Sequence, residues 1–313
     1  MRHEALIHTV AMLLSALLGL FLGRLTDVGM SEIFIDAALG AMLYFVFVCI
    51  DGSSLRRAFG NNRFTATSLL LNFLWTPFLA FGLGLLFFAG DVDVRVGLLL
   101  CLAAPCTDWY LVFTAAARGD VAVSSAILPL NLILQIVLVP VYFVLLLGPS
   151  VGTPSVELLL LALSTLAVPL VVAVVVRHFL PRVREVSESN ASTGQITFLC
   201  AAVFLMFLGC AGEMTDNLPT LVWCLVPLIL FFVLMTVVAR LVSAAQGWEH
   251  PLTASLTFTV LARNSPLVLA MMAPIFQDRP LVLAVLVVCP LVELPFLSAV
   301  SYVMGRRAEL GQL

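Results

Sequence analysis

The sequence predicts an all-α polytopic membrane protein, in which ten transmembrane helices form two inverted five-helix repeats and the fourth and ninth helices are interrupted and cross. Three observations lead to this fold class. The composition is too apolar for a soluble protein, ten apolar stretches are long enough to span a bilayer, and two of them carry similar helix-breaking motifs. Because few residues remain for an extramembrane part, residues 1–313 are predicted to form a single transmembrane transporter domain.

Composition and charge exclude several classes of protein. Of the 313 residues, 62% are hydrophobic and 11% are charged, against about 25% charged residues in an average soluble domain. All 15 basic residues are arginines, so lysine chemistry is excluded. The net charge of -3 and the absence of a basic cluster argue against a nucleic-acid partner. The seven cysteines have no zinc-like or disulfide-framework spacing, so we expect no metal or cofactor and interpret six of them as small buried residues.

The ten apolar stretches define the predicted spans and their orientation. They cover residues 5–23, 33–50, 64–89, 96–117, 121–147, 155–180, 195–212, 218–242, 252–274 and 281–304. With ten spans, both termini and the even-numbered loops share one side, which carries eleven arginines, whereas the other side carries three. The positive-inside rule therefore predicts a protein of the cell membrane with both termini in the cytoplasm.

An internal repeat divides the chain into halves of about residues 1–150 and 151–313. An offset of 158 residues places the tetrad Pro105-Cys106-Thr107-Asp108 of the fourth span on Arg263-Asn264-Ser265-Pro266 of the ninth. The same offset places Gln135 on Glu293. Because each half has an odd number of spans, the second copy must run with inverted topology, which is a common plan of secondary transporters.

Each tetrad combines a proline with a charged residue in the middle of an apolar span. Proline removes a helix donor and frees backbone groups, which are tolerated at membrane depth where protein or a hydrated cavity supplies partners. Two such breaks at matching depth predict a shared polar site, although a single proline often only kinks a packed helix. The candidate solute-binding residues are Cys106, Thr107, Arg263, Asn264 and Ser265.

Three further positions, Asp108, Glu293 and Gln135, are candidates for ion coupling. A charged side chain at the membrane centre costs about 2.5–3.5 kcal/mol, so we expect Asp108 and Arg263 to pair, in either a structural or a gating role. Glu293 lies between two prolines of the tenth span. Desolvation favours the protonated form of such a carboxylate, which suits a proton carrier, whereas a hard cation would use its oxygens as ligands.

Cys106 is the one soft ligand within a tetrad. A thiophilic species such as trivalent arsenic would find there an affinity that hydroxyl groups alone do not supply. The alternative is that Cys106 is a small packing residue, as intramembrane cysteines usually are.

The motifs resemble those of the Acr3-type arsenite efflux permeases, within the larger group that includes the sodium and bile-acid symporters. The residues that carry the resemblance are Cys106 with Gly119-Asp120 thirteen positions later, the segment Asn131–Gln135, the segment Pro290-Leu-Val-Glu293-Leu-Pro295, and Phe258-Thr259 with Asn264. The resemblance implies a panel of helices beside a core in which the fourth and ninth helices cross. It also implies efflux of arsenite or antimonite, with roles for Cys106 and Glu293.

The chain departs from that family pattern in three places. It has Phe113-Thr114-Ala115 where Trp-Asn-Asp is usual, and Arg263 and Pro266 where Asn and Glu are usual. Thr259 stands where the sodium-coupled relatives have Glu. The last departure favours protons over sodium as the coupling ion.

The predicted function is a secondary active transporter that exports arsenite, antimonite or a related small solute in exchange for protons. The alternative is a sodium-coupled symporter of an organic anion, in which Arg263 would face the acid group of the solute and Thr107, Asn264, Ser265, Gln135 and Glu293 would bind sodium. An enzyme is not expected, because the four histidines lie at helix ends or near the termini. A pore is less consistent with inverted repeats and interrupted helices than alternating access is.

Overall fold

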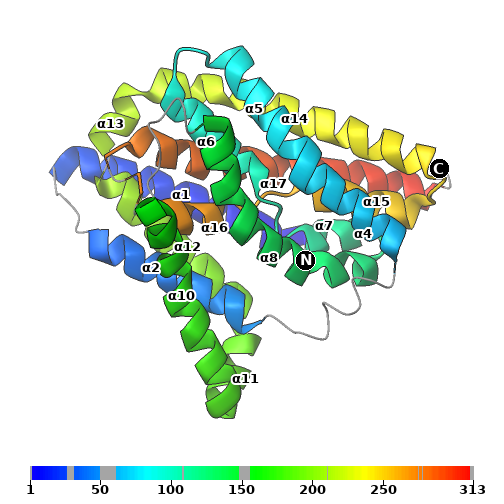
Figure 1. Ribbon diagram of the computed structural model, residues 1–313, viewed down its shortest axis with the longest axis horizontal. Helices are drawn as coiled ribbons and strands as arrows, with labels where there is room; N and C mark the ends of the chain where they lie inside the picture. The colour runs from blue at the N-terminus through cyan, green and yellow to red at the C-terminus, as the bar shows by residue number, and fades with distance from the viewer. Residues whose placement is uncertain are drawn as a thin grey trace.

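The computed structural model describes residues 2–26, 32–49, 61–107, 109–147, 156–209, 211–273, 275–276 and 278–310. All the regular elements in these ranges are helices, which confirms the all-α class (Figure 1). They are α1 (Arg2–Thr26), α2 (Glu32–Val48), α4 (Asn62–Leu70), α5 (Thr76–Phe87), α6 (Val92–Ala103), α7 (Tyr110–Ala116), α8 (Val121–Tyr142), α10 (Val156–Phe179), α11 (Pro181–Ser189), α12 (Ala191–Gly209), α13 (Ala211–Asp216), α14 (Leu218–Ala245), α15 (His250–Leu261), α16 (Ser265–Met272) and α17 (Pro280–Glu309). A π-helical turn, Leu71–Trp75, joins α4 to α5, and a second one, Phe143–Leu147, extends α8.

Several of these helices are built to cross a bilayer. In the described part of the chain, five continuous helical segments are long and apolar enough to span a membrane, and α10 with α11, bent by 119°, would make a sixth. The protein is therefore a multi-pass membrane protein. The number of ten spans stays a prediction, because the half-helices α6, α7, α15 and α16 hold only 7 to 12 residues each.

The helices form two groups (Figure 1). Helices α1, α2, α10 and α12 pack side by side and are called the panel here. Helices α4 to α8 and α14 to α17 form the second group, the transport core, in which α6 packs against α5 and α17 and α14 packs against α15 and α17. The panel contacts the transport core where α1 meets α17 and where α2 and α10 meet α16. A panel beside a core is the arrangement that the family resemblance implies.

Two glycines allow α1 and α12 of the panel to approach closely. A Cβ atom at Gly19 would lie 2.4 Å from the carbonyl oxygen of Phe204, and one at Gly23 would lie 2.4 Å from the carbonyl oxygen of Leu208. Neither position has room for a side chain, so this small-xxx-small pair sets the distance between the two backbones.

We expect Gly19→Ala to lower the thermal unfolding temperature of the detergent-purified protein. The added methyl group must push α1 away from α12, and overpacking of this kind costs about 1–3 kcal/mol. Gly82→Ala in α5 is the matched control, because Gly82 is exposed and nothing lies within 4 Å of a Cβ built there. Alanine is the better helix former, so the control variant should be as stable as the wild type or more stable. Equal unfolding temperatures for the two variants would contradict the close contact.

The interpretation of the cysteines needs a correction. Cys101 of α6 and Cys289 of α17 are fully buried, as expected, but they form a disulfide, with their Cα atoms 6.7 Å apart. A separation of 188 residues gave no sign of this pairing. It arises because α6 and α17, from opposite halves of the chain, pack directly against each other.

Candidate functional site

The first predicted helix break lies between α6 and α7. Helix α6 ends at Ala103, and Ala104 takes an extended backbone conformation, with φ -98° and ψ 116°. The cause is local, since the residue before a proline disfavours the helical region, and Pro105 follows. Helix α7 begins only at Tyr110, and Pro105, Cys106 and Thr107 lie in non-helical backbone, as predicted, whereas Asp108 lies outside the described residues.

The second predicted break, between α15 and α16, forms in a related way. Ala262 is extended, with φ -72° and ψ 134°, and ends α15. Asn264 then caps α16, since its side-chain oxygen accepts the backbone N–H of Leu267 at 3.4 Å. Pro266 lies in the first turn of α16, where a missing N–H leaves no hydrogen bond unmade.

The two breaks are joined through their backbones. The N–H of Cys106 donates to the carbonyl of Ala262 at 2.9 Å, and the N–H of Asn264 donates to the carbonyl of Ala104 at 2.8 Å. The two hydrogen bonds form an isolated antiparallel bridge between Pro105 and Arg263. The 158-residue offset relates position 104 to 262 and position 106 to 264, so the repeat exchanges one hydrogen bond with the other. The crossing of the two halves is therefore fixed by main-chain atoms.

A small pocket lies at this crossing. Five of the predicted residues line it, namely Cys106, Thr107, Arg263, Asn264 and Glu293. The cavity has a volume of about 10 Å³, which is room for about one water molecule. Gln195 of α12 also lines the pocket, which therefore lies between the panel and the transport core. Gln195 was not among the predicted site residues, since its only signal in the sequence is an amide side chain at the start of an apolar span.

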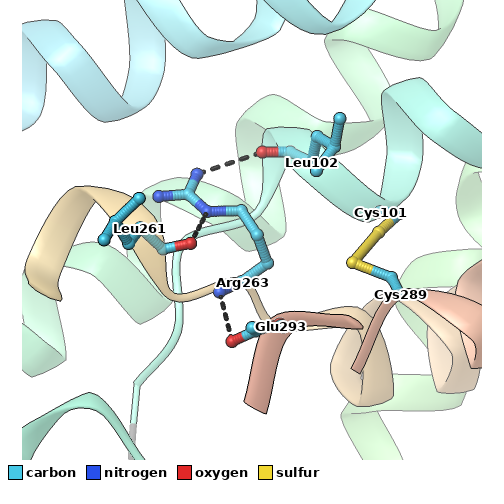
Figure 2. The surroundings of a disulfide bond; sticks show 6 residues. All are labelled: Cys101, Leu102, Leu261, Arg263, Cys289 and Glu293. Atoms are coloured by element: carbon cyan, nitrogen blue, oxygen red, sulfur yellow. Dashed lines mark hydrogen bonds between the residues drawn. A yellow bond between two sulfur atoms is a disulfide. The ribbon is translucent and has the colours of Figure 1, made fainter. Parts of the chain in front are cut away.

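Arg263 is almost completely buried, with 2% of its surface exposed. Figure 2 shows its guanidinium beside the ends of two helices. Its donors reach three backbone carbonyls and one side-chain oxygen, those of Leu102 (3.0 Å), Leu261 (3.2 Å), Val260 and Asn72 (Oδ1, 2.9 Å). The predicted partner Asp108 lies outside the described residues, so the ion pair between Asp108 and Arg263 stays a prediction.

Glu293 connects α17 to the second break. Its carboxylate oxygen Oε1 accepts the backbone N–H of Arg263 at 2.9 Å, and its side chain is 1% exposed (Figure 2). Helix α17 continues through Pro290 and Pro295 on either side of it. A buried carboxylate thus lies at the pocket and holds the backbone of the break directly.

The thiol of Cys106 and two polar groups complete the pocket. Cys106 is 6% exposed and is one of the residues that line the pocket. The amide nitrogen of Asn264 donates to the hydroxyl of Thr107 at 3.2 Å, which connects the side chains of the two tetrads. The site thereby offers a soft sulfur, a hydroxyl, an amide and a carboxylate within one small enclosure.

The amino-acid sequence matches the model of the Sodium Bile acid symporter family over residues 37–217, which is more than half of the chain. The chain belongs to the sodium bile acid symporter family. A relative supports the same grouping: the arsenical-resistance protein Acr3 of Corynebacterium glutamicum is 24% identical over 318 residues, covering 93% of this chain and 86% of the relative. The resemblance to the Acr3-type group is confirmed, and so is the interpretation of the chain as a transporter rather than an enzyme.

Two predicted residues of this symporter-family protein lie outside the pocket. Ser265 borders a second small pocket, together with Pro266 and Pro290, and its buried hydroxyl has no hydrogen-bond partner among the described residues. Gln135 of α8 is fully buried away from both pockets. The structure thus brings five of the eight candidate residues together, places Ser265 next to them and separates Gln135 from them.

The surroundings of Gln135 differ from those of its repeat counterpart Glu293. Glu293 accepts the N–H of Arg263, but the counterpart of Arg263 under the offset is Pro105, which has no N–H to donate. Both amide atoms of Gln135, and both amide atoms of Asn131 one turn earlier, have no hydrogen-bond partner in the described part of the chain. Buried amides without partners are rare, so these two residues are candidates for a polar ligand or ion.

Proposed function

We propose that this protein is a secondary active transporter that exports arsenite, antimonite or a related small solute in exchange for protons. The observation that carries the proposal is the pocket at the crossing, where the Cys106 thiol and the buried Glu293 carboxylate line the same enclosure between the panel and the transport core. A thiol suits a soft solute, and a desolvated carboxylate suits a proton carrier.

The proposal includes a fold of ten spans in two inverted repeats, within one domain of residues 1–313. Helices α6 and α15 both have 12 residues, and they begin 158 residues apart, at Val92 and His250. Helices α5 and α14 end with the same separation, at Phe87 and Ala245. The exchange-symmetric hydrogen bonds of the bridge support a two-fold axis through the crossing. The spans would be α1, α2, α4 with α5, α6 with α7, and α8 in the first repeat, then α10, α12, α14, α15 with α16, and α17 in the second.

The orientation in the membrane follows from the arginines. We propose that both termini face the cytoplasm and that the protein resides in the cell membrane. Three arginines of the richer side support this, since Arg118 pairs with Glu309 at 3.0 Å, and Arg240 and Arg307 line one surface pocket. The ends of α7, α14 and α17 therefore share one face. Arg279 of the poorer side pairs instead with Asp93, at the beginnings of α17 and α6.

In the proposed mechanism, the solute is held by side chains from both breaks. Cys106 supplies the soft ligand, and Thr107 and Asn264 supply the hydroxyl and amide that bind the oxygen atoms of the solute. Ser265, in the adjoining pocket, would join them when the pocket widens. Arg263 contributes a fixed positive charge at the pocket wall. Gln195 lies on the panel, so a displacement of the panel against the transport core would open the pocket.

The coupling ion acts on the same enclosure. When Glu293 gains a proton it becomes a weaker acceptor for the N–H of Arg263, which loosens the connection between α17 and the second break. Proton binding and solute binding then compete for one arrangement of the crossing, as exchange requires. Gln135 and Asp108 are proposed as further ion-coupling positions, the first because its buried amide has no hydrogen-bond partner among the residues that the structure describes.

A sodium-coupled symporter of an organic anion is the second candidate function. Membership of the sodium bile acid symporter family favours it, and the hydroxyl, amide and carboxylate oxygens at the crossing are the ligands that a hard cation uses. In this mechanism the Cys106 thiol would have no part.

Transport assays distinguish the two functions. Cells that lack their own arsenite exporters should accumulate less arsenite and antimonite when they express the wild-type protein. In everted membrane vesicles, uptake of arsenite should require an imposed pH gradient and persist when choline replaces sodium. Unchanged accumulation and resistance would contradict the arsenite proposal. Sodium-dependent uptake of an organic anion would establish the second candidate instead.

A further inference from the structure

We propose that the guanidinium of Arg263 is a resident cation, which fills a cation site built from the carbonyl ends of the two broken helices. The transporter would then carry a tethered positive charge where a mobile monovalent cation would otherwise bind. The consequence for ion coupling rests on the proposed function, whereas the site itself rests only on the contacts of Arg263.

The site exists because the bridge between the breaks uses N–H groups that would otherwise continue the helices. In a continuous helix, the carbonyl of Leu102 would accept the N–H of Cys106, and the carbonyl of Val260 would accept that of Asn264. Both N–H groups instead donate across the bridge, to the carbonyls of Ala262 and Ala104. The carbonyls of Leu102 and Val260 are left without helical partners, and the guanidinium of Arg263 donates to both of them.

Four oxygen atoms converge on the guanidinium and form what we term the carbonyl cage. It comprises the backbone carbonyls of Leu102, Val260 and Leu261 and the side-chain Oδ1 of Asn72. The amide nitrogen of Asn72 donates to the carbonyl of Thr259 at 3.3 Å, which turns Oδ1 toward Arg263. All four ligands are neutral hard oxygens, the class that coordinates sodium and similar cations. Unwound backbone carbonyls at broken helices form such ion sites in transporters.

Electrostatics also require a positive charge at this position. The cage lies at the C-terminal ends of α6 and α15, where each helix dipole places a partial negative charge of about half an elementary charge. Among the described residues, no carboxylate lies within ion-pair distance of the guanidinium, and Glu293 engages the backbone N–H of Arg263 instead. Within the described part of the chain, the hydrogen-bond acceptors of the guanidinium are all carbonyl and amide oxygens, as the ligands of a bound metal cation would be.

The cage is closed on its remaining side. The Cζ atom of Arg263 lies 5.7 Å from the centre of the Phe231 ring, a cation–π contact between two buried side chains. Arg263 is only 2% exposed, and its guanidinium already engages all four oxygens of the cage. We infer that this site does not bind sodium in the wild-type protein. The coupling ion would then bind at the Glu293 carboxylate.

Thermal unfolding of the detergent-purified protein tests the resident cation. Arg263→Ala removes the guanidinium but keeps the backbone N–H that binds Glu293. The wild type should unfold at the same temperature in sodium chloride and in choline chloride. Arg263→Ala should unfold several degrees lower in choline chloride, and sodium chloride or millimolar guanidinium chloride should restore much of the loss, because a cation that binds only the folded state stabilises it.

Two further variants make the result decisive. Arg263→Lys retains a tethered cation and should be insensitive to the choice of salt. Arg279→Ala removes an arginine that pairs with Asp93 outside the cage, and should show no restoration by cations. The proposal is overturned if Arg263→Ala responds to cations no more than the wild type does. It is also overturned if no folded Arg263→Ala protein can be purified in either sodium chloride or guanidinium chloride. Because no solute is added, a positive result would stand even if arsenite transport were absent.

Discussion

Glu293→Gln is expected to reduce solute export on the order of tenfold or more, while the protein remains folded. The amide oxygen of Gln can still accept the N–H of Arg263, which the carboxylate accepts at 2.9 Å, so the second break keeps its support from α17. What the variant loses is the ability to bind and release a proton in a buried site. The measurement is arsenite uptake into everted vesicles driven by a pH gradient, with the thermal unfolding temperature as a check on folding.

Glu309→Gln is the matched control for this experiment. Glu309 is on the same helix, but it is exposed and pairs with Arg118 at 3.0 Å, far along α17 from the pocket. An exposed ion pair contributes little to stability, about 0–1 kcal/mol, so this control should transport at the wild-type rate. A Glu293→Gln protein that exports arsenite as fast as the wild type would show that the coupling proton is carried elsewhere.

Cys106→Ser should weaken the apparent affinity for trivalent arsenic and antimony on the order of tenfold, because a hydroxyl replaces the thiol of a pocket residue. The bridge should survive, since Cys106 takes part in it through its backbone N–H. The measurement is the dependence of transport rate on solute concentration. The expected signature is a raised KM with a smaller change in the maximal rate.

Cys224→Ser provides the comparison for Cys106→Ser. Cys224 is a fully buried thiol of α14 that does not line the pocket, so the same chemical change is made away from the solute. Its KM should match that of the wild type. If Cys106→Ser also leaves KM unchanged, sulfur does not recognise the solute, and the organic-anion function with hard oxygen ligands becomes the better interpretation.

The sequence predicted the helix breaks well because their cause is local. Pro105 forces Ala104 into an extended conformation, and Asn264 caps the helix that follows the second break. Such signals act over two to four residues and can be identified without any knowledge of the fold. The repeat offset then placed the two breaks together, and five candidate residues do share one pocket.

The hydrogen bonds of Arg263 could not be predicted from the sequence, and the reason is physical. Its acceptors are mostly backbone carbonyls, which every residue has and which therefore leave no mark in the amino-acid pattern. A charged partner such as Asp108 was the only kind of partner that the sequence could indicate. Asn72 and Gln195 were missed likewise, since a single amide in an apolar span gives no sign of which neighbour it faces.

The disulfide between Cys101 and Cys289 could not be predicted from the sequence either. Cys101 and Cys289 meet only because α6 of the first half packs against α17 of the second. Their spacing along the chain contains no information about that packing. Gln135 differs from its repeat counterpart Glu293 for a local reason. Glu293 accepts the backbone N–H of Arg263, whereas Pro105, at the position equivalent to Arg263, has no N–H that Gln135 could accept.

The main-chain bridge between the two breaks has a consequence for how the family could diversify. Backbone atoms of residues 104, 106, 262 and 264 hold the crossing together, so its hydrogen bonds need an N–H at positions 106 and 264 but no particular side chain. On the proposed function, a change of solute would proceed by substitutions at Cys106, Thr107 and Ser265 that leave these hydrogen bonds in place. On the proposed function, the atoms that hold the crossing together and the side chains that bind the solute are therefore different groups.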